Sequence, residues 1–260
     1  MPLPHARLFG SLVASVALLL ALATPVDANH SWNGYHWART ANPFTVALGD
    51  NLTTPDWKSH LGQTASDWST SNVLDAAVAA GGSPRRNCRP NAGRVEVCNA
   101  SYGNNGWLGV ATIWVSGLHI TQGTVKLNDY YLQSSTYAYA NSAEREHVIC
   151  QEVGHTFGLD HQSTDGSSLN TCMDYYHNTS DSDTKSTTPN QHDYDELGII
   201  YQHLDSTSTL GGAPARGAVA VSGFSEDGTP NGAARERGNW YVQHLGGGDF
   251  VWVHVYWASR

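Results

Sequence analysis

The stretch "HVICQEVGHTFGLDH", residues 147–161, decides the fold of this chain, because it joins a helical repeat to a sharp turn. Ile149, Val153 and Phe157 recur every four residues, which predicts a helix with one buried face. We expect this helix to stop at Gly158, since glycine accepts the backbone conformations found at helix ends. A long helix followed by a tight turn is therefore the first fixed element of the fold.

The same stretch has the spacing of a metal site. Gln151 and His155 are four residues apart, on one helix face and within reach of one ion. After the turn, His161 returns to complete a set of three neutral ligands. Three protein ligands leave a fourth position for water, as in catalytic zinc sites. Glu152 follows the first ligand directly and is placed to accept a proton from that water.

The motif "QEVGHTFGLDH" resembles the metzincin signature H-E-x-x-H-x-x-G-x-x-H at every fixed position except the first. The following "TCMDY" resembles the Met-turn of that family, with Met173 beneath the metal. The resemblance, to matrixin-like and gametolysin-like members, implies a zinc-dependent endopeptidase with Glu152 as general base and protein or peptide substrates. It also assigns Tyr175 to oxyanion stabilisation, as in the astacin-like branch, with ordinary packing as the alternative.

The resemblance spans about residues 40–205 and implies an α+β fold: a twisted mixed β-sheet, an active-site helix, a Met-turn and a C-terminal helix. In this reading "ITQGTVKLND", residues 120–129, looks like the edge strand of the substrate cleft. The segment "HDYDELGIIYQHL", residues 192–204, looks like the C-terminal helix.

Gln151 is the departure from the family pattern. Its Oε1 reaches as far from the backbone as an imidazole Nε2 and is also neutral, but it is a poorer donor. The site could therefore bind copper instead of zinc, and some gametolysin-related members carry the same Q-E-x-x-H variant.

His147 lies eight residues before His155, about 12 Å along the helix axis, which is too far for both to bind one ion, so we expect a packing role for it. Asp160 either supports His161 or is a solvated loop acid.

The remaining elements follow from local patterns. Strands are predicted at residues 44–50, 94–101 and, twice, within 107–129, and helices at 54–71, 142–158 and 191–204. Residues 73–82 fit either a strand or a short helix. Thr54 and Ser142 are the expected N-caps of the first two helices.

The N-terminus predicts export. Residues 1–28 read as a signal peptide, with an apolar run at residues 8–23 that is short for a bilayer span. A secreted protein with no membrane partner after cleavage is expected, and export favours disulfides. Of the three possible pairings we favour Cys88 with Cys98 and Cys150 with Cys172. The net charge of −9 argues against a nucleic-acid partner.

The chain divides by composition into a peptidase domain at residues 29–205 and a C-terminal extension at residues 206–260. The extension ends in a predicted β-hairpin around Gly246–Gly248, either packed on the main domain or forming a small β-unit. Two other functions compete with the peptidase: a catalytically impaired, secreted binding protein on the metzincin scaffold, and a wall or adhesion protein that uses the aromatic extension.

Overall fold

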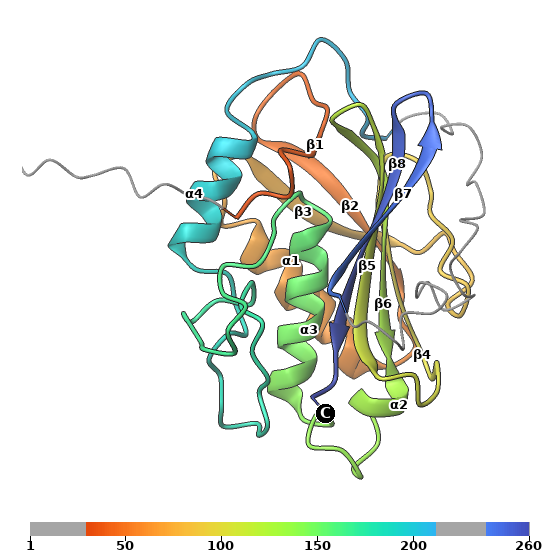
Figure 1. Ribbon diagram of the computed structural model, residues 1–260, viewed down its shortest axis with the longest axis vertical. Helices are drawn as coiled ribbons and strands as arrows, with labels where there is room; N and C mark the ends of the chain where they lie inside the picture. Colours follow the sequence, from red (N-terminus) through yellow and green to blue (C-terminus); the bar gives the residue numbers. More distant parts are fainter. Residues whose placement is uncertain (1–29, 212–237, 260) are drawn as a thin grey trace, which may run out of the picture.

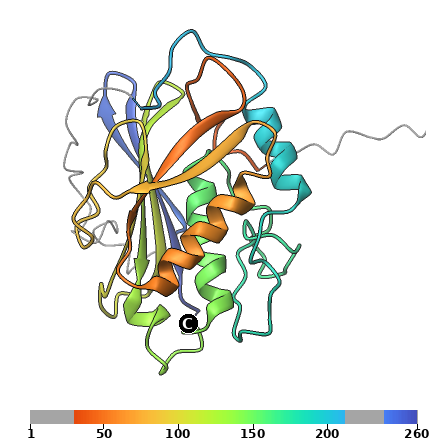
Figure 2. The same ribbon diagram turned by 180° about the vertical axis from the view of Figure 1, so that it is seen from behind.

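One twisted sheet carries the fold, and its helices gather on one face (Figures 1 and 2). The computed structural model describes residues 30–211 and 238–259, so the predicted signal peptide lies outside the described residues. The elements in chain order are β1 (His36–Trp37), β2 (Phe44–Asn51), α1 (Pro55–Trp68), β3 (Leu74–Ala80), β4 (Val95–Ala100), β5 (Trp107–Ser116), β6 (His119–Asn128), α2 (Asp129–Leu132), α3 (Ser142–His155), α4 (Gln191–Ile200), β7 (Trp240–Gly246) and β8 (Asp249–Trp257). This confirms the predicted α+β class.

The sheet is mixed, with strand order β3-β2-β4-β6-β5-β8-β7 and β1 paired to β6. Strands β3, β2, β4 and β6 run parallel to one another, while β5 is antiparallel to both β6 and β8. The ambiguous segment at residues 73–82 is thus a strand, because β3 pairs with β2 along its whole length, from Leu74 opposite Phe44 to Ala80 opposite Asp50.

One expectation was wrong: residues 120–129 do not form an edge strand. They belong to β6, which lies between β4 and β5 and is hydrogen-bonded on both sides. The strand is almost wholly buried along its length, which an edge facing a cleft would not be. Strand β5, which lies between β6 and β8, contacts the motif helix, with Gly109 against Glu152.

Helix α1 shows how the local patterns were satisfied. The hydroxyl of Thr54 accepts a hydrogen bond from the Trp57 amide at 3.2 Å, so Thr54 is the predicted N-cap. Trp57, Leu61 and Trp68 then repeat along one buried face. For α3 the cap lies one residue earlier than predicted: Asn141 is extended, and its side chain accepts from the Glu144 amide, which leaves Ser142 as the first helical residue.

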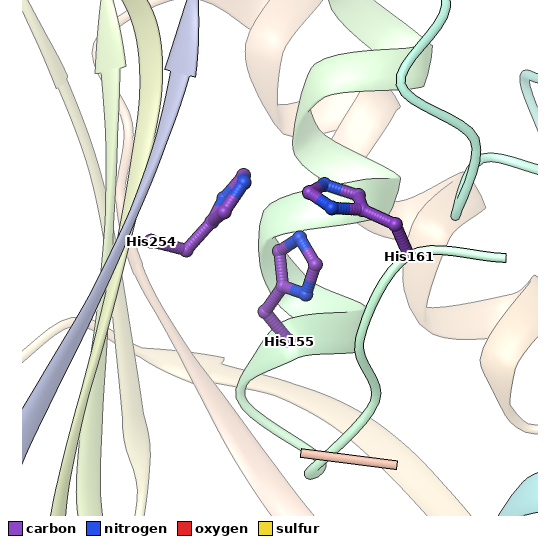
Figure 3. Close-up of side chains that lie close together, drawn as sticks. All are labelled: His155, His161 and His254. Atoms are coloured by element: carbon purple, nitrogen blue, oxygen red, sulfur yellow. The ribbon is translucent and has the colours of Figure 1, made fainter. Parts of the chain in front are cut away.

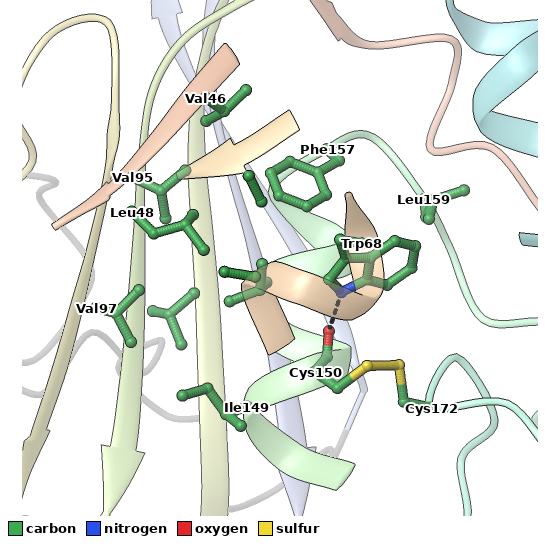
Figure 4. Packing of buried hydrophobic residues seen from close by; sticks show 14 of the residues in the cluster. Val46, Leu48, Trp68, Val95, Val97, Ile149, Cys150, Phe157, Leu159 and Cys172 are labelled. Atoms are coloured by element: carbon green, nitrogen blue, oxygen red, sulfur yellow. Dashed lines mark hydrogen bonds between the residues drawn. A yellow bond between two sulfur atoms is a disulfide. The ribbon is translucent and has the colours of Figure 1, made fainter. Parts of the chain in front are cut away.

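The main core lies between the sheet and the pair α1 and α3 (Figure 4). Ile149, Val153 and Phe157 are all fully buried, as their spacing predicted. The indole of Trp68 donates to the Cys150 carbonyl at 3.1 Å and ties α1 to α3. Both predicted disulfides are present, Cys88–Cys98 and Cys150–Cys172, and the second joins α3 to the segment that follows the site.

The C-terminal hairpin is part of the same sheet. Strand β8 pairs with β5 from Trp107 opposite Trp257 to Ser116 opposite Asp249, and β7 pairs with β8 beyond it. Odd-numbered residues of β8 form a second core with β5 on the face away from α3; its buried members are Trp107, Val110, Val251, Val253, Val255 and Trp257. Even-numbered residues therefore point towards α3. No helix among the described residues is long and apolar enough to cross a bilayer.

Candidate metal centre

The turn after α3 places the motif residues. Gly158 has φ +97°, and a Cβ there would collide with the carbonyl oxygen of Tyr35, so only glycine fits. The chain reverses at this point, and Ser31 forms a β-bridge to Leu159. As a result His161 comes back over the C-terminal turn of α3, where His155 lies.

Three histidines converge at this point: His155 from α3, His161 from the following loop and His254 from β8 (Figure 3). Their ligand nitrogens all lie within 4.8 Å of one another. The ring centroids are 4.8 Å apart for His155 and His161, 4.0 Å for His155 and His254, and 4.7 Å for His161 and His254. All three side chains are buried.

The hydrogen bonds orient two of these rings. His155 donates from Nδ1 to the Leu159 carbonyl at 2.8 Å, which leaves the lone pair of Nε2 directed at the cluster. In His254, Nδ1 lies 2.9 Å from Oε2 of Glu152, so its Nε2 also faces the cluster. Among the described residues, the Nε2 atoms of all three histidines are buried without a hydrogen-bond partner.

These orphaned nitrogens fit a metal ion. Burial, the largest cause, holds the pKa of each of the three histidines well below its ordinary value, and their mutual proximity adds to this for His155 and His161. Neutral imidazoles are the form that ligates zinc and copper. Burying three Nε2 atoms that have no hydrogen-bond partner among the described residues costs free energy, which a bound metal ion would offset.

Gln151 anchors the site to the predicted Met-turn. Its amide nitrogen donates to the carbonyls of Cys172 at 2.9 Å and Asp174 at 2.7 Å. This fixes the amide orientation and leaves Oε1 buried without a partner in the described part of the chain. Gln151 as a metal ligand therefore stays a prediction, carried by this free oxygen. Met173 is fully buried against α3, where a Cβ on Gly154 would lie 2.6 Å from its sulfur.

Glu152 lies beside the histidines and has no exposed surface. One carboxylate oxygen contacts His254, and the other has no partner among the described residues. Burial raises the pKa of Glu152 well above its ordinary value, and a backbone hydrogen bond from Ala111 opposes this shift. Gly109 of β5 makes room for the side chain, since a Cβ there would approach Glu152 Oε1 to 2.8 Å.

The other predicted residues have definite places. The ring of Tyr175 packs against His161 at 5.3 Å, and its hydroxyl accepts from the Trp257 amide of β8 at 2.9 Å. Asp160 accepts from the backbone amide of His161 at 2.7 Å. His147 is buried and bonded through Nδ1 to the Ser186 carbonyl, so its expected packing role is confirmed. The catalytic role of Tyr175 remains a prediction.

His254 is the residue that sequence reasoning missed, together with Trp240, whose ring lies 4.8 Å from His155 and 4.5 Å from His254. A usable signal was present in "DFVWVHVYW", where valines alternate with aromatic and histidine residues. Alternation assigns His254 to the face opposite the valines, but it does not say which strand β8 joins.

Comparison with known proteins adds little to this geometry. No protein-family model matches the chain, and no curated protein sequence matches it either. Among solved structures, "Structure of myroilysin" is similar at 13% identity and a TM-score of 0.38, covering 67% of this chain and 99% of that chain. "Crystal structure of myroilysin" is similar at 12% identity and a TM-score of 0.36, covering 64% of this chain and 86% of that one.

Proposed function

We propose that the chain is a secreted, metal-dependent endopeptidase. Gln151, His155 and His161 would bind the metal, and Glu152 would be the general base. The expected metal is zinc, and copper is the alternative. The observation that supports this is the convergence of His155 and His161 at the end of α3, each with a buried Nε2 that has no hydrogen-bond partner in the described residues. Glu152 lies beside them and contacts the third histidine of the cluster, His254.

The side chains have separable tasks in this proposal. A bound zinc ion supplies an acidified water and an electrophile for the scissile carbonyl. The Glu152 carboxylate accepts the proton of the attacking water and passes it to the leaving amine. Leu159 keeps the His155 ring in the ligating tautomer through its carbonyl. Tyr175 lies against His161, from where its hydroxyl can stabilise an oxyanion once it is released from β8.

The arrangement seen here is closed. Glu152 and His155 have no exposed surface, and His254 contacts the base. A peptide bond cannot reach Glu152 unless β8 moves, so turnover requires an open form. The same closure supports a second candidate, a secreted binding protein in which a buried metal only stabilises the fold, because structural zinc sites have all their positions filled by protein.

Metal content and proteolysis of denatured casein separate the two candidates. Long incubations are needed, because the rate of casein cleavage is proportional to the fraction of molecules in the open form. The peptidase predicts chelator-sensitive cleavage by the wild type and its loss in Glu152→Gln, which keeps the size of the side chain. Equal rates in the two proteins would refute the peptidase. One bound metal with no cleavage in either protein would favour the binding protein.

Gln151→His tests the unusual ligand. If Oε1 is a ligand, the histidine variant binds zinc more tightly, because imidazole is the better donor. The variant also loses the two hydrogen bonds to the Cys172 and Asp174 carbonyls, so Gln151→Leu is the control for that loss. Equal zinc affinity in the leucine variant and the wild type would remove Gln151 from the ligand set.

A further inference from the structure

Strand β8 occupies the edge on which an extended substrate would lie. It covers β5 with an antiparallel ladder that runs from Trp107 to Ser116. Strand β5 forms one wall of the site, because its residue Gly109 lies directly against Glu152. Extended peptides commonly bind proteins by adding a strand to an open sheet edge. A substrate strand beside Glu152 would need the same backbone groups of β5 that β8 already uses.

The register places one side chain of β8 in the reaction centre. His254 lies opposite Ala111 of β5, and its position in the strand turns the ring towards α3. Its Nε2 faces His155 and His161, and its Nδ1 bonds to Glu152. One imidazole therefore engages both the place of the metal and the predicted base.

The hairpin is also held by contacts around this ring. Trp240 of β7 packs on His155, His161 and His254, and lies 4.1 Å from Trp32. Tyr256 of β8 donates to the Tyr176 carbonyl, in the segment that follows Met173. Trp240 and Tyr256 therefore hold the part of the hairpin that carries His254 against the site.

We propose that β8 is an intramolecular occupant of the substrate edge and that His254 is its metal ligand, a third imidazole in the position that water or a substrate carbonyl would take. The ligation stands on the geometry of the three histidines alone. The inhibitory role rests on the proposed peptidase function. Two separate experiments keep these parts distinguishable.

The ligand experiment uses the full chain in a His203→Ala background, which removes the second zinc site inferred below, so that one zinc is held per chain. It measures the number of imidazole ligands by X-ray absorption, together with affinity by chelator competition, and wild type here means wild type at residue 254. We expect three imidazoles in the wild type and two in His254→Ala, with affinity reduced at least about tenfold, since even loss of a partner to a metal ligand has that effect. His244→Ala is the control, because His244 is an exposed histidine of the same hairpin. An unchanged imidazole number in His254→Ala would overturn the ligation.

The second experiment tests whether β8 blocks the substrate edge. One variant fixes the hairpin on β5 with a disulfide, and another weakens its packing. Ser116 and Asp249 lie opposite each other at the end of the β5–β8 ladder, so Ser116→Cys with Asp249→Cys can form a cross-strand disulfide. The native disulfides are buried and resist mild reductant. We expect casein cleavage to fall at least about tenfold in the oxidised variant and to recover on reduction. The wild type treated with the same reductant is the control.

Loosening should have the opposite effect. Val253→Thr places a hydroxyl in the second core, on the face of β8 away from the site, and should raise the open population and the rate about 5- to 30-fold. Val46→Thr makes the same change in buried β2 and should leave the rate unchanged. Equal cleavage by the locked and reduced forms would overturn the inhibitory role. No cleavage by any form would refute the peptidase, while the imidazole number still decides the role of His254.

A second cluster, formed by β1, the start of β6 and the segment after α4, carries an independent inference. His36 of β1, His203 and Asp205 after α4 present ligand atoms within 4.8 Å of one another. Nε2 of His36 lies 3.2 Å from Nε2 of His203, and both lie close to Asp205 Oδ1, at 3.6 and 3.7 Å. Nε2 of His119, at the start of β6, is 3.1 Å from the same oxygen.

These separations match those around a tetrahedral zinc ion, whose ligands at about 2.0–2.1 Å stand roughly 3.4 Å apart. The ring of His36 is buried and donates from Nδ1 to the Gly34 carbonyl at 2.8 Å, which leaves its Nε2 lone pair facing the cluster. Asp205 is oriented by Arg39, which contacts Oδ2 at 3.0 Å and leaves Oδ1 for the histidines.

We infer that His36, His203 and Asp205 bind a second divalent transition metal such as zinc, which would join the segment after α4 to β1. The test counts zinc per chain after removal of loosely bound metal. We expect His203→Ala to lose one zinc and the rise in Tm that zinc gives, since His203 is exposed and its removal leaves the core intact. The neighbouring exposed Gln202→Ala should keep both. Identical zinc content in His203→Ala and the wild type would overturn this site.

Discussion

Gly154 offers a sharp test of how the predicted Met-turn packs against α3. In an isolated helix, Gly→Ala stabilises by about 0.5–1 kcal/mol. At Gly154, however, a Cβ would lie 2.6 Å from the Met173 sulfur and 2.6 Å from Cζ2 of Trp68. Gly62 in α1 is the matched control, because a Cβ there meets nothing within 4 Å.

The cost at Gly154 falls at the upper end of the overpacking range, about 3 kcal/mol. Trp68 cannot yield easily, since its ring is fully buried and its indole is bonded to the Cys150 carbonyl. After the helical gain, Gly154→Ala should be destabilised by about 2 kcal/mol. Gly62→Ala should be stabilised by up to about 1 kcal/mol.

Thermal unfolding followed by circular dichroism measures the difference. At about 2–4 °C per kcal/mol for a chain of this size, Tm should fall by roughly 4–8 °C in Gly154→Ala and rise by roughly 1–4 °C in Gly62→Ala. The packing of Met173 beneath α3 would be refuted if both substitutions moved Tm in the same direction. Zinc affinity should also fall in Gly154→Ala alone, because a displaced Met173 moves the Cys172 and Asp174 carbonyls that hold Gln151.

Three further predictions concern stability. Asn190→Ala should cost about 1–2 kcal/mol in urea unfolding, because the capping box of α4 is lost; an unchanged midpoint would contradict the cap. Arg39→Met should cost about 3 kcal/mol, since it removes a buried guanidinium that is paired with the Asp205 carboxylate and bonded to the Tyr201 carbonyl, and less in an Asp205→Asn background. Burial lowers the pKa of His30 to about 4 and raises that of Asp193 to about 7, so the stability from His30 increases with pH between about 4 and 6.5 while that from Asp193 decreases. His30→Asn should therefore lose stability relative to the wild type by up to about 1.4 kcal/mol per pH unit across that window, and a constant difference would contradict the lowered pKa of His30.

Local patterns predicted most of the elements that hold the site. The repeat of Ile149, Val153 and Phe157 predicted the buried face of α3, and the glycine at 158 predicted the turn that returns His161. The N-cap of α3 was predicted one residue too late, because adjacent polar residues can cap the same backbone amides. Asn141, and not Ser142, accepts from the Glu144 amide. The helix face, the turn and the caps depend on interactions between residues close together in the sequence, so they can be predicted from it.

Strand neighbours could not be predicted in the same way. The segment at residues 120–129 resembled the edge strand of the family, yet all but its last residue lie inside the sheet as part of β6. Its apolar residues suit either position, since what distinguishes an edge is the absence of a partner, and that partner comes from elsewhere in the chain. The hairpin around Gly246–Gly248 was predicted, but both a separate unit and a packed position remained open.

The sequence by itself determined the motif helix, the turn after it and the spacing of Gln151, Glu152, His155 and His161. Each follows from backbone periodicity and from the chemistry of single residues. Only the tertiary structure decided that β8 covers β5 and brings His254 into the cluster. The physical reason is that backbone hydrogen bonds at a strand edge are the same for every partner, so the partner is chosen by the packing of both faces together.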